Sequence, residues 1–424
     1  MNFRPTIVAL ALATAAIGVA PASAQYGAPP PQQQQQQIQP PAPTQAPQRT
    51  PNISRRASKA LTELQDAVNA SDVATITAKL AAAQAAAQSS DEKYFVAQLQ
   101  LKAAAAAKNQ AAMAAAVEAM LASGGVEQSN RGPLYVELGN IHLQAKQHAQ
   151  AAAALERAIG LNSNNAEALA LLGETRNAQG RSNEAVALLQ RALKAKLAGG
   201  QKPDESWYKR AIAIAYQAQM PSSMELSRQW VAAYPSPASW RDALRIYRKV
   251  GKPDEATTLD TLRLARAAGA LEGDGDFHVY AFAASNTAAV GEARAVIDEA
   301  IAAKHIDPAK PLFKDIIATL RADRSMSREA LPELAKNALA DPAARLAVRT
   351  ADALYGYGEY AKAAELYRAT LTKTGADSSL VNLHLGMALA RAGDKAGATA
   401  ALNAVTGPRA ELAKYWLMYV ATRT

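Results

Sequence analysis

The chain has 424 residues, of which 49% are hydrophobic, 20% charged and 5% aromatic, and its formal net charge is +9. Glycine and proline are not in excess, which excludes a collagen-like or wholly disordered chain. Cysteine is absent, which excludes disulfides, thiolate zinc sites, iron–sulfur clusters and a cysteine nucleophile. Almost a quarter of the residues are alanine, the best helix former, so we expect many helices packed at short distance rather than one large aromatic core.

Residues 1–24 have the pattern of a bacterial secretory signal peptide. Arg4 supplies a positive charge, residues 6–20 are almost continuously apolar, and residues 22–24 (Ala-Ser-Ala) match a cleavage site that would leave Gln25 first. The alternative is an uncleaved membrane anchor, but the apolar run is shorter than the roughly 20 residues that a membrane-spanning helix needs. No cysteine follows the signal, so a lipoprotein is not expected. The sequence therefore predicts a periplasmic or secreted protein with no transmembrane segment after cleavage.

Residues 25–52 form a low-complexity segment rich in proline and glutamine. Such a segment buries too little apolar surface to offset the entropy of ordering, so we expect a disordered linker. It is either a functional tether or a plain spacer after the signal peptide, and the spacer is slightly favoured.

Residues 53–127 carry helical patterns without a clear repeat. They predict four helices in two hairpins, which are either degenerate repeats or an N-terminal cap. The predicted helices are 58–70, 72–88, 92–109 and 111–122, with Ser71 or Asp72 and Ser90 or Asp91 as N-caps.

Two consecutive blocks, 134–165 and 168–196, align at an offset of 34 residues. The matched residues are Leu138-Gly139 with Leu172-Gly173, Ala151 with Ala185, Leu155 with Leu189, and Ala158 with Ala192. Near the C-terminus an offset of 35 relates Gly358 to Gly393, Ala363 to Ala398 and Tyr367 to Leu402. Small residues at helix crossings and larger apolar residues between them indicate helix hairpins. Each hairpin has an apolar flank that only the next hairpin covers.

This pattern resembles the tetratricopeptide repeat family. The residues that carry the resemblance in the first block are Tyr135, Leu138, Gly139, His142, Ala151, Leu155 and Ala158. The resemblance covers roughly 130–406, and it implies an all-α fold, a right-handed superhelical solenoid of antiparallel helix hairpins, over 128–424. The lysine, asparagine and arginine of the family's best-known peptide clamp are not reproduced, since Val136, Asn140, Ala170 and Glu174 stand at the corresponding places. That clamp's specificity is therefore not carried over.

The middle of the chain has looser spacing. Trp207 and Trp240, 33 residues apart, predict the first helices of two further units. Residues 277–300 fit a fifth unit, and 313–334 fit a sixth less well. The apolar segment 410–420 is typical of a terminal capping helix.

No reactive or metal-binding motif is recognisable. The five histidines include no HExxH pair, and His142 stands at the repeat's aromatic position, where packing is the better interpretation. Phosphate-cradling and nucleophile-elbow motifs are also missing. The acidic segment 272–276 fails as a calcium loop, because Phe277 or Val279 occupies the place of the required glycine, so we expect a helix N-cap and hinge there. We therefore expect no enzyme, no catalytic residue, no metal and no cofactor.

One basic face is a candidate for partner binding. Arg241, Arg245 and Arg248 recur at i, i+4 and i+7 with Lys249 beside them, while Trp240, Ala243, Leu244, Tyr247 and Val250 share an apolar face. The resemblance implies that these arginines lie on the concave wall of the solenoid, where Lys209 and Arg210 of the preceding unit would extend them. Guanidinium groups suit carboxylates or phosphates. The simpler interpretation is a solvated face partly neutralised by Asp242 and Glu255.

These observations lead to a non-catalytic periplasmic scaffold that binds a protein or peptide on the concave face. The alternative hypothesis is an accessory subunit that binds an anionic polysaccharide or assists export of an envelope polymer. A third hypothesis is an enzyme. Export argues against nucleic acid as the partner despite the basic charge, and favours acidic protein segments or anionic glycans.

Overall fold

The computed structural model of the chain describes residues 51–287, 289–322 and 327–422. The predicted signal peptide and residues 25–50 of the predicted linker lie outside these residues. By its internal contacts, Asn52–Thr424 is one structural unit. Its described residues are helical, with one isolated β-bridge between Ala343 and Thr374.

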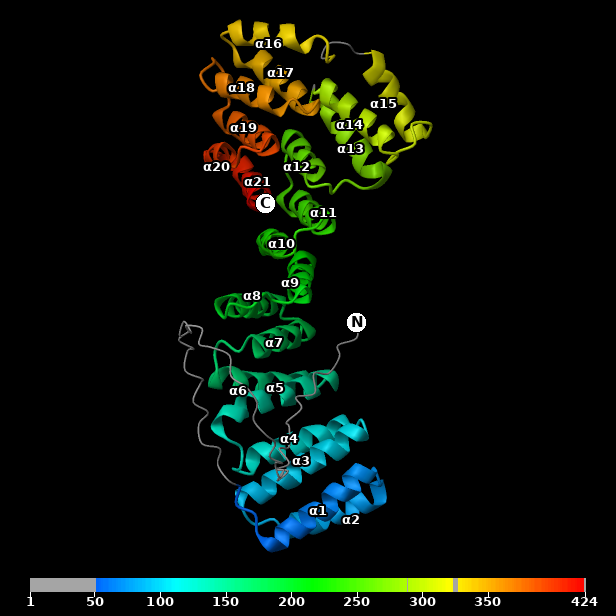
Figure 1. The fold of residues 1–424 in the computed structure, drawn as a ribbon, viewed down its shortest axis with the longest axis vertical. Helices are drawn as coiled ribbons and strands as arrows, with labels where there is room; N and C mark the ends of the chain where they lie inside the picture. The colour runs from blue at the N-terminus through cyan, green and yellow to red at the C-terminus, as the bar shows by residue number, and fades with distance from the viewer. Residues whose placement is uncertain (1–50, 288, 323–326, 423–424) are drawn as a thin grey trace, which may run out of the picture. The chain divides into compact units, whose positions relative to one another are not determined.

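Helices follow one another along the chain with short connections (Figure 1). The α-helices of the described residues are α1 (Arg55–Ala70), α2 (Val73–Ala86), α3 (Ser90–Ala106), α4 (Gln110–Ala122), α5 (Gln128–Gln144), α6 (His148–Leu161), α7 (Ala166–Ala178), α8 (Ser182–Ala198), α9 (Glu205–Gln217), α10 (Ser222–Ala233), α11 (Pro237–Ile246), α12 (Glu255–Ala267), α13 (Gly273–Asn286), α14 (Val290–Ala302), α15 (Pro311–Ala322), α16 (Leu331–Ala340), α17 (Ala344–Gly356), α18 (Tyr360–Thr370), α19 (Ser378–Ala392), α20 (Lys395–Asn403) and α21 (Ala410–Thr422). A π-helical turn, Tyr247–Gly251, follows α11, and a 3₁₀ turn, Gly407–Arg409, precedes α21.

Most of these helices pack as consecutive pairs, as the repeat pattern predicts. The pairs are α1–α2, α3–α4, α5–α6, α7–α8, α9–α10, α13–α14, α17–α18 and α19–α20. The expected all-α, tetratricopeptide-like fold is therefore confirmed. Trp207 lies in α9, the first helix of the pair α9–α10, as expected. Trp240 lies in α11, which packs mainly against α10 rather than pairing with α12.

Three glycines allow the two helices of a pair to approach closely. Each is followed sixteen residues later by a leucine that fills the space a side chain would occupy. The contacts are Gly139–Leu155, Gly173–Leu189 and Gly386–Leu402. A Cβ atom on Gly139 or Gly386 would lie 2.5 Å from the leucine Cγ, and one on Gly173 would lie 3.0 Å away. The tight crossing therefore requires glycine or a shift of the leucine.

The four N-terminal helices match the sequence prediction closely, with one correction. Asp72 caps α2, but the N-cap of α3 is Ser89 rather than Ser90 or Asp91. Ser89 Oγ accepts a hydrogen bond from the amide of Glu92, and the Glu92 carboxylate accepts from the amide of Ser89 at 2.9 Å. This reciprocal capping box satisfies two free amide groups at once, which makes Ser89 the better start of the helix.

The sixth unit departs from the repeat. Its two helices, α15 and α16, do not pack as a pair in the described structure; α15 packs on α13 and α14, and α16 packs on α17 and α18. Helix α14 instead contacts α17 directly. The weak repeat signal over 313–334 therefore corresponds to two separate helices rather than to a hairpin.

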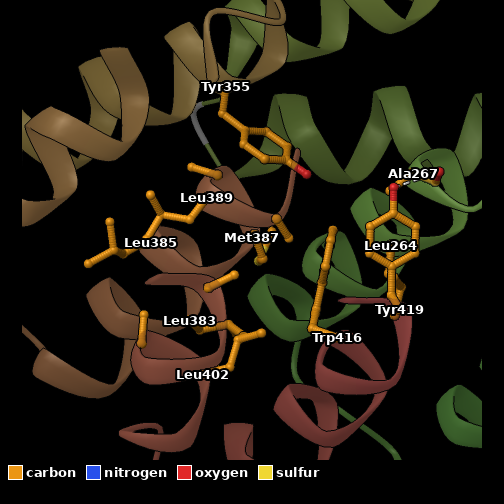
Figure 2. Close-up of a cluster of buried hydrophobic side chains, with 14 of the residues drawn as sticks. Leu264, Ala267, Tyr355, Leu383, Leu385, Met387, Leu389, Leu402, Trp416 and Tyr419 are labelled. Carbon is orange, nitrogen blue, oxygen red and sulfur yellow. Dashed lines mark hydrogen bonds between the residues drawn. The ribbon is translucent and has the colours of Figure 1, made fainter. Parts of the chain in front are cut away.

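Helix α21 caps the last pair, as expected, and has further contacts that the sequence did not predict. It packs against α19 and α20, and also against α10 and α12. Figure 2 shows Trp416 and Tyr419 of α21 beside Leu264 of α12 and Met387 of α19. Trp416 is fully buried, so the C-terminal helix is part of a core that joins distant parts of the sequence.

Polar contacts fix α21 in this position. The Tyr419 hydroxyl donates to the backbone oxygen of Ala267 at 3.2 Å, and Glu411 forms an ion pair with Arg228 of α10. The Tyr415 hydroxyl lies 3.1 Å from that of Ser227.

None of the helices that the structure describes has the length and apolar character needed to cross a membrane.

Candidate functional site

Helix α11 places the predicted basic face. Ser236 and Ser239 form a capping box at its start, where Pro237 suits the first helical position. The predicted apolar side is buried at Trp240, Ala243, Leu244 and Tyr247, while Val250 is half-buried. The remaining side of the helix is therefore the one that carries the arginines.

Arg241 is bound by the segment that precedes α13. Its Nε donates to the backbone oxygen of Ala270 at 3.0 Å, and a terminal nitrogen lies 2.5 Å from the Glu272 carboxylate. Only 22% of the side chain is exposed. Arg241 therefore joins α11 to the start of the next unit.

Arg248 faces the same way. It lines a small cavity with Arg241 and with Asp276 of α13, and the cavity volume of about 10 Å³ holds at most one water molecule. Burial lowers the pKa of Arg248, and the charge of Asp276 acts in the opposite direction. The side chains of Arg241 of α11 and Arg248 of the following π-helical turn thus line one cavity with Asp276 of α13.

Arg245 lies on the exposed side of α11, and Lys249 is exposed in the π-helical turn that follows it. The Arg245 side chain is 61% exposed, and its closest carboxylate is Asp242 at 3.6 Å, a loose surface pair. Lys249 is exposed as well. Of the basic residues on this helix and its π-helical turn, these two offer their charged groups most directly to another molecule.

Lys209 lies on α9 and contacts Glu205 and Trp230. Its Nζ is 3.0 Å from Glu205 and 5.5 Å from the centre of the Trp230 ring. Hydrogen bonds from Lys209 and from the Trp230 indole lower the pKa of Glu205. Arg210 beside it pairs with Glu174 at 2.7 Å. The five predicted site residues are therefore divided between an edge that contacts α13, an exposed pair, and Lys209 on the preceding unit.

The acidic segment before α13 starts a helix, as expected. Helix α13 begins at Gly273, and the carboxylate of Asp276 accepts a hydrogen bond from the Glu272 amide at 3.0 Å. Asp274 forms an ion pair with Lys310. Throughout the described ranges, no group of three or more histidine, aspartate or glutamate side chains is arranged to hold a metal ion.

A set of buried charges, which the sequence analysis missed, lies between α12, α14, α17 and α19. We call it the buried charge cluster; its members are Asp260, Arg263, Glu292, Asp352 and His384. Arg263 pairs with Glu292 at 2.5 Å and with Asp260 at 2.8 Å. The hydroxyl of Tyr280 donates to Glu292 at 2.8 Å.

His384 bridges two of these carboxylates. Its Nε2 lies 3.0 Å from Asp260 and its Nδ1 lies 2.9 Å from Asp352. Burial by itself lowers the pKa of His384, but the two carboxylates raise it to about 9. Although burial opposes ionisation of Asp352, His384 and Arg263 hold its pKa at about 2. His384 and Asp352 are therefore both charged at neutral pH, and the ion pairs of the cluster join α12, α14, α17 and α19.

A larger cavity, of about 440 Å³, lies between α12, α14, the end of α17 and the residues before α16. Its lining includes Arg266, Arg294, Arg328, Asp298, Glu329 and Tyr357. Arg266 pairs with Glu299 and donates to the Gly356 backbone oxygen at 3.2 Å. Arg294 donates to the Leu320 backbone oxygen at 2.9 Å. Cations and carboxylates are mixed along this lining, so the charge of a ligand is not indicated.

The chain was compared with protein families and with solved structures, and a family model agrees with the repeat. The family model described as "Tetratricopeptide repeat" matches residues 142–198. A solved tetratricopeptide repeat protein from Parabacteroides merdae ATCC 43184 aligns with 11% identity and a TM-score of 0.33, over 70% of this chain and 99% of that one. The structure of Naa15/Naa10 bound to HypK-THB aligns with 13% identity and a TM-score of 0.31, over 84% of this chain and 65% of that one. No curated protein matches the sequence.

Proposed function

We propose that this protein is a non-catalytic, periplasmic scaffold that binds a protein or peptide across the first helices of its tetratricopeptide-like units. The observation that carries the proposal is the exposed pair formed by Arg245 of α11 and Lys249 of the π-helical turn after it, within an array of consecutive helix pairs. The match of residues 142–198 to the tetratricopeptide repeat model supports the same role. An array of this kind offers extended surface rather than one deep pocket.

The partner that fits this surface carries negative charge. Exposed arginine and lysine side chains attract carboxylates over several ångströms and increase the rate of encounter, and this effect weakens as salt is added. Arg241 and Arg248 contribute to the local positive potential although Glu272 and Asp276 partly neutralise them. Binding should therefore depend on salt concentration.

Crosslinking in intact cells, followed by identification of the captured proteins, tests the proposal. The double variant Arg245→Gln/Lys249→Gln should reduce capture of the partner, and about tenfold weaker binding at low salt corresponds to about 1.4 kcal/mol. The matched control is Lys336→Gln/Lys362→Gln, which removes the same charge from exposed lysines on α16 and α18. Equal capture by both double variants across a salt series would refute the α11 site.

The periplasmic location rests on the signal-peptide pattern of residues 1–24. Cell fractionation with N-terminal sequencing tests it directly. We expect the mature chain in the periplasmic fraction to begin at Gln25. Full-length protein confined to the cytoplasm would contradict this location.

An anionic polysaccharide is the alternative partner, and a row of lysines beside aromatic rings around α9 supports it. There three lysines lie over aromatic rings, with distances to the ring centres of 5.8, 3.6 and 5.5 Å. The pairs are Lys196–Trp207, Lys202–Tyr234 and Lys209–Trp230. Trp207 and Tyr234 are half-buried and Trp230 is buried, and cations beside the two partly exposed rings suit a negatively charged polymer. Retention on immobilised polygalacturonate, with no protein captured in cells, would favour this alternative over a protein partner.

A further inference from the structure

Helix α14 contacts α17 although the chain passes through α15 and α16 between them. These intervening helices do not fill the contact, because α15 packs on α13 and α14 whereas α16 packs on α17 and α18 (Figure 1). A Cβ atom on Gly356 of α17 would lie 2.5 Å from the Cα atom of Glu292 in α14, so the two backbones meet closely there. Because this contact skips a unit, the repeat spacing does not determine which residues of α14 meet α17.

Apolar packing gives α14 and α17 no common core. The buried apolar residues of α14, such as Val296 and Ile297, pack in one cluster with α13 and α15. Those of α17, such as Ala351 and Leu354, pack in another cluster with α18, α19 and α21. Among the described residues, these two clusters have in common only helix α12 and the partly buried Leu271. By contrast, a single apolar cluster runs from α7 to α11.

The buried charge cluster lies where that common core is missing. Glu292 is its member from α14 and Asp352 its member from α17. Arg263 of α12 joins the two, at 2.5 Å from Glu292 and 3.6 Å from Asp352. Ion pairs and hydrogen bonds require particular atoms at particular distances, whereas apolar contacts tolerate repacking. The cluster therefore restricts the position of α14 on α17 more sharply than apolar contacts would.

Two further contacts depend on the same position of α14. Arg294 of α14 donates to the hydroxyl of Tyr357 at 2.9 Å, and Arg266 of α12 donates to the backbone oxygen of Gly356 at 3.2 Å. All four residues line the cavity of about 440 Å³. The shape of that cavity is therefore tied to the position of α14 on α17.

The cost of burying charge makes the cluster informative. Arg263 and Glu292 are at most 2% exposed. Removing such groups from water is expensive, and replacing a buried ion pair by apolar residues of similar volume is often neutral or stabilising. In some proteins, buried polar groups instead select one arrangement of helices among several.

We propose that the buried charge cluster fixes the position of α14 on α17, and that an apolar core in its place would be at least as stable but less specific. A shift of α14 by one helical turn, about 5.4 Å, would separate Glu292 from Arg263 and is therefore disfavoured while the charges are present. Without the charges, more than one position of α14 has a similar free energy. This inference concerns the shape of the array and does not depend on the proposed partner.

Distances between spin labels, measured by double electron–electron resonance on the full chain, test the proposal. The chain has no cysteine, so introduced cysteines are labelled specifically. The reporting pair is Ala302→Cys on α14 and Lys362→Cys on α18, both at exposed positions. The control pair is Lys362→Cys and Thr399→Cys, on α18 and α20, whose helices share one apolar cluster. With the natural charge cluster, each pair should give one narrow distance.

An apolar variant removes the whole cluster. Replacing all its members together avoids the unpaired charges that a single substitution leaves, and the two tyrosines that donate to the cluster lose their hydroxyls as well. The substitutions are Asp260→Leu, Arg263→Met, Glu292→Leu, Asp352→Leu, His384→Leu, Tyr280→Phe and Tyr367→Phe. We expect a urea midpoint at least equal to that of the wild type, and a second distance about 5 Å from the first in the reporting pair only.

A milder variant changes only the contribution of α14. Glu292→Gln keeps the shape of the side chain but removes the charge that pairs with Arg263. We expect the reporting pair to show the original distance together with a minor second one. Asp298→Asn, which removes one charge from an exposed position of the same helix, is the matched control and should keep a single distance.

The apolar variant decides the outcome if circular dichroism shows that it is folded. A second distance in the reporting pair supports the inference, and a single unchanged distance overturns it. A urea midpoint well below that of the wild type would assign the cluster to stability and also overturn it. If the apolar variant does not fold, Glu292→Gln decides by the same criterion. A second distance in the control pair as well would indicate general loosening of these helices and would count against the inference.

Discussion

The region of α1–α9 and the region of α10–α21 are built from similar helix pairs but are held together differently. In the first region, helices pack against those next or next but one in sequence, and the core consists of several clusters, one of which continues from α7–α9 into α10 and α11. In the second region, α21 returns to α10 and α12, and α14 packs directly on α17. One large cluster there includes Val231 of α10 and Val420 of α21.

This difference bears on stability. Where each unit contacts only its neighbours, stability is approximately a sum of local terms, and a damaged unit affects the units beside it. Where distant helices share one core and one buried charge cluster, damage at any point is expected to affect the whole region. The two regions should therefore respond differently to similar substitutions.

The largest effect is expected from Arg263→Leu. It removes a buried cation and leaves Asp260, Glu292 and Asp352 close together, with only His384 to balance them. Breaking a buried ion pair from one side costs about 3–5 kcal/mol. Hydrogen exchange in increasing urea should show α12–α21 losing protection while α1–α9 keeps it. Arg245→Leu, at an exposed position, is the control, and loss of protection that is uniform along the chain would contradict the division into two regions.

A pH titration should affect the second region selectively. The pKa of His384 is about 9 in the folded chain against 6.5 for a free histidine, so the charged form stabilises the fold. That stabilisation is complete below about pH 6.5 and is lost as pH rises through about 9. The shift corresponds to about 3 kcal/mol, which urea unfolding of α12–α21 between these pH values should show. His384→Gln should remove this dependence; if the dependence persists, another group is responsible.

A matched pair of substitutions compares the regions at the same local contact. Gly139→Ala and Gly386→Ala both place a Cβ atom 2.5 Å from the Cγ of a buried leucine. Overpacking of this kind costs about 1–3 kcal/mol. We expect Gly139→Ala to reduce hydrogen-exchange protection in α4–α7 only, and Gly386→Ala to reduce it across α10–α21. If each variant loses hydrogen-exchange protection only in the helices next to its substitution, the contacts of α21 do not link the stabilities of the helices in the second region.

The smallest effect concerns the start of the first region. Backbone amides of Ser54, Ser89 and Gln88 donate to the Glu92 carboxylate and lower its pKa to about 2. The stabilisation of the fold by the ionised Glu92 carboxylate is therefore present above pH 4.5 and is lost as pH falls towards 2. Glu92→Gln should cost about 1 kcal/mol, as loss of a helix cap does. Limited proteolysis near α1 at neutral pH measures this, and an unchanged cleavage rate would contradict it.

Much of the fold could be predicted from the sequence, because repeated packing leaves a repeated pattern. Leu138-Gly139 and Leu172-Gly173 predict the pairs α5–α6 and α7–α8 from spacing alone. The interpretation of the basic face was less complete. The i, i+4, i+7 spacing places Arg241, Arg245 and Arg248 on one side of α11, but it contains no information about Glu272, which binds the first of them.

The sequence by itself determined which segments are helical, how the helices of the clear repeats pair, and why Gly139 and Gly173 lie where those pairs approach. These features depend on residues about 16 or 34 positions apart, and the same spacings recur in several units of the sequence. Only the tertiary structure decided that α21 returns to α10 and α12, and that His384 meets Asp260, 124 positions away. Each of these long-range contacts occurs only once, so it leaves no repeated spacing in the sequence. The two residues of such a contact meet only because of the path that the intervening helices take.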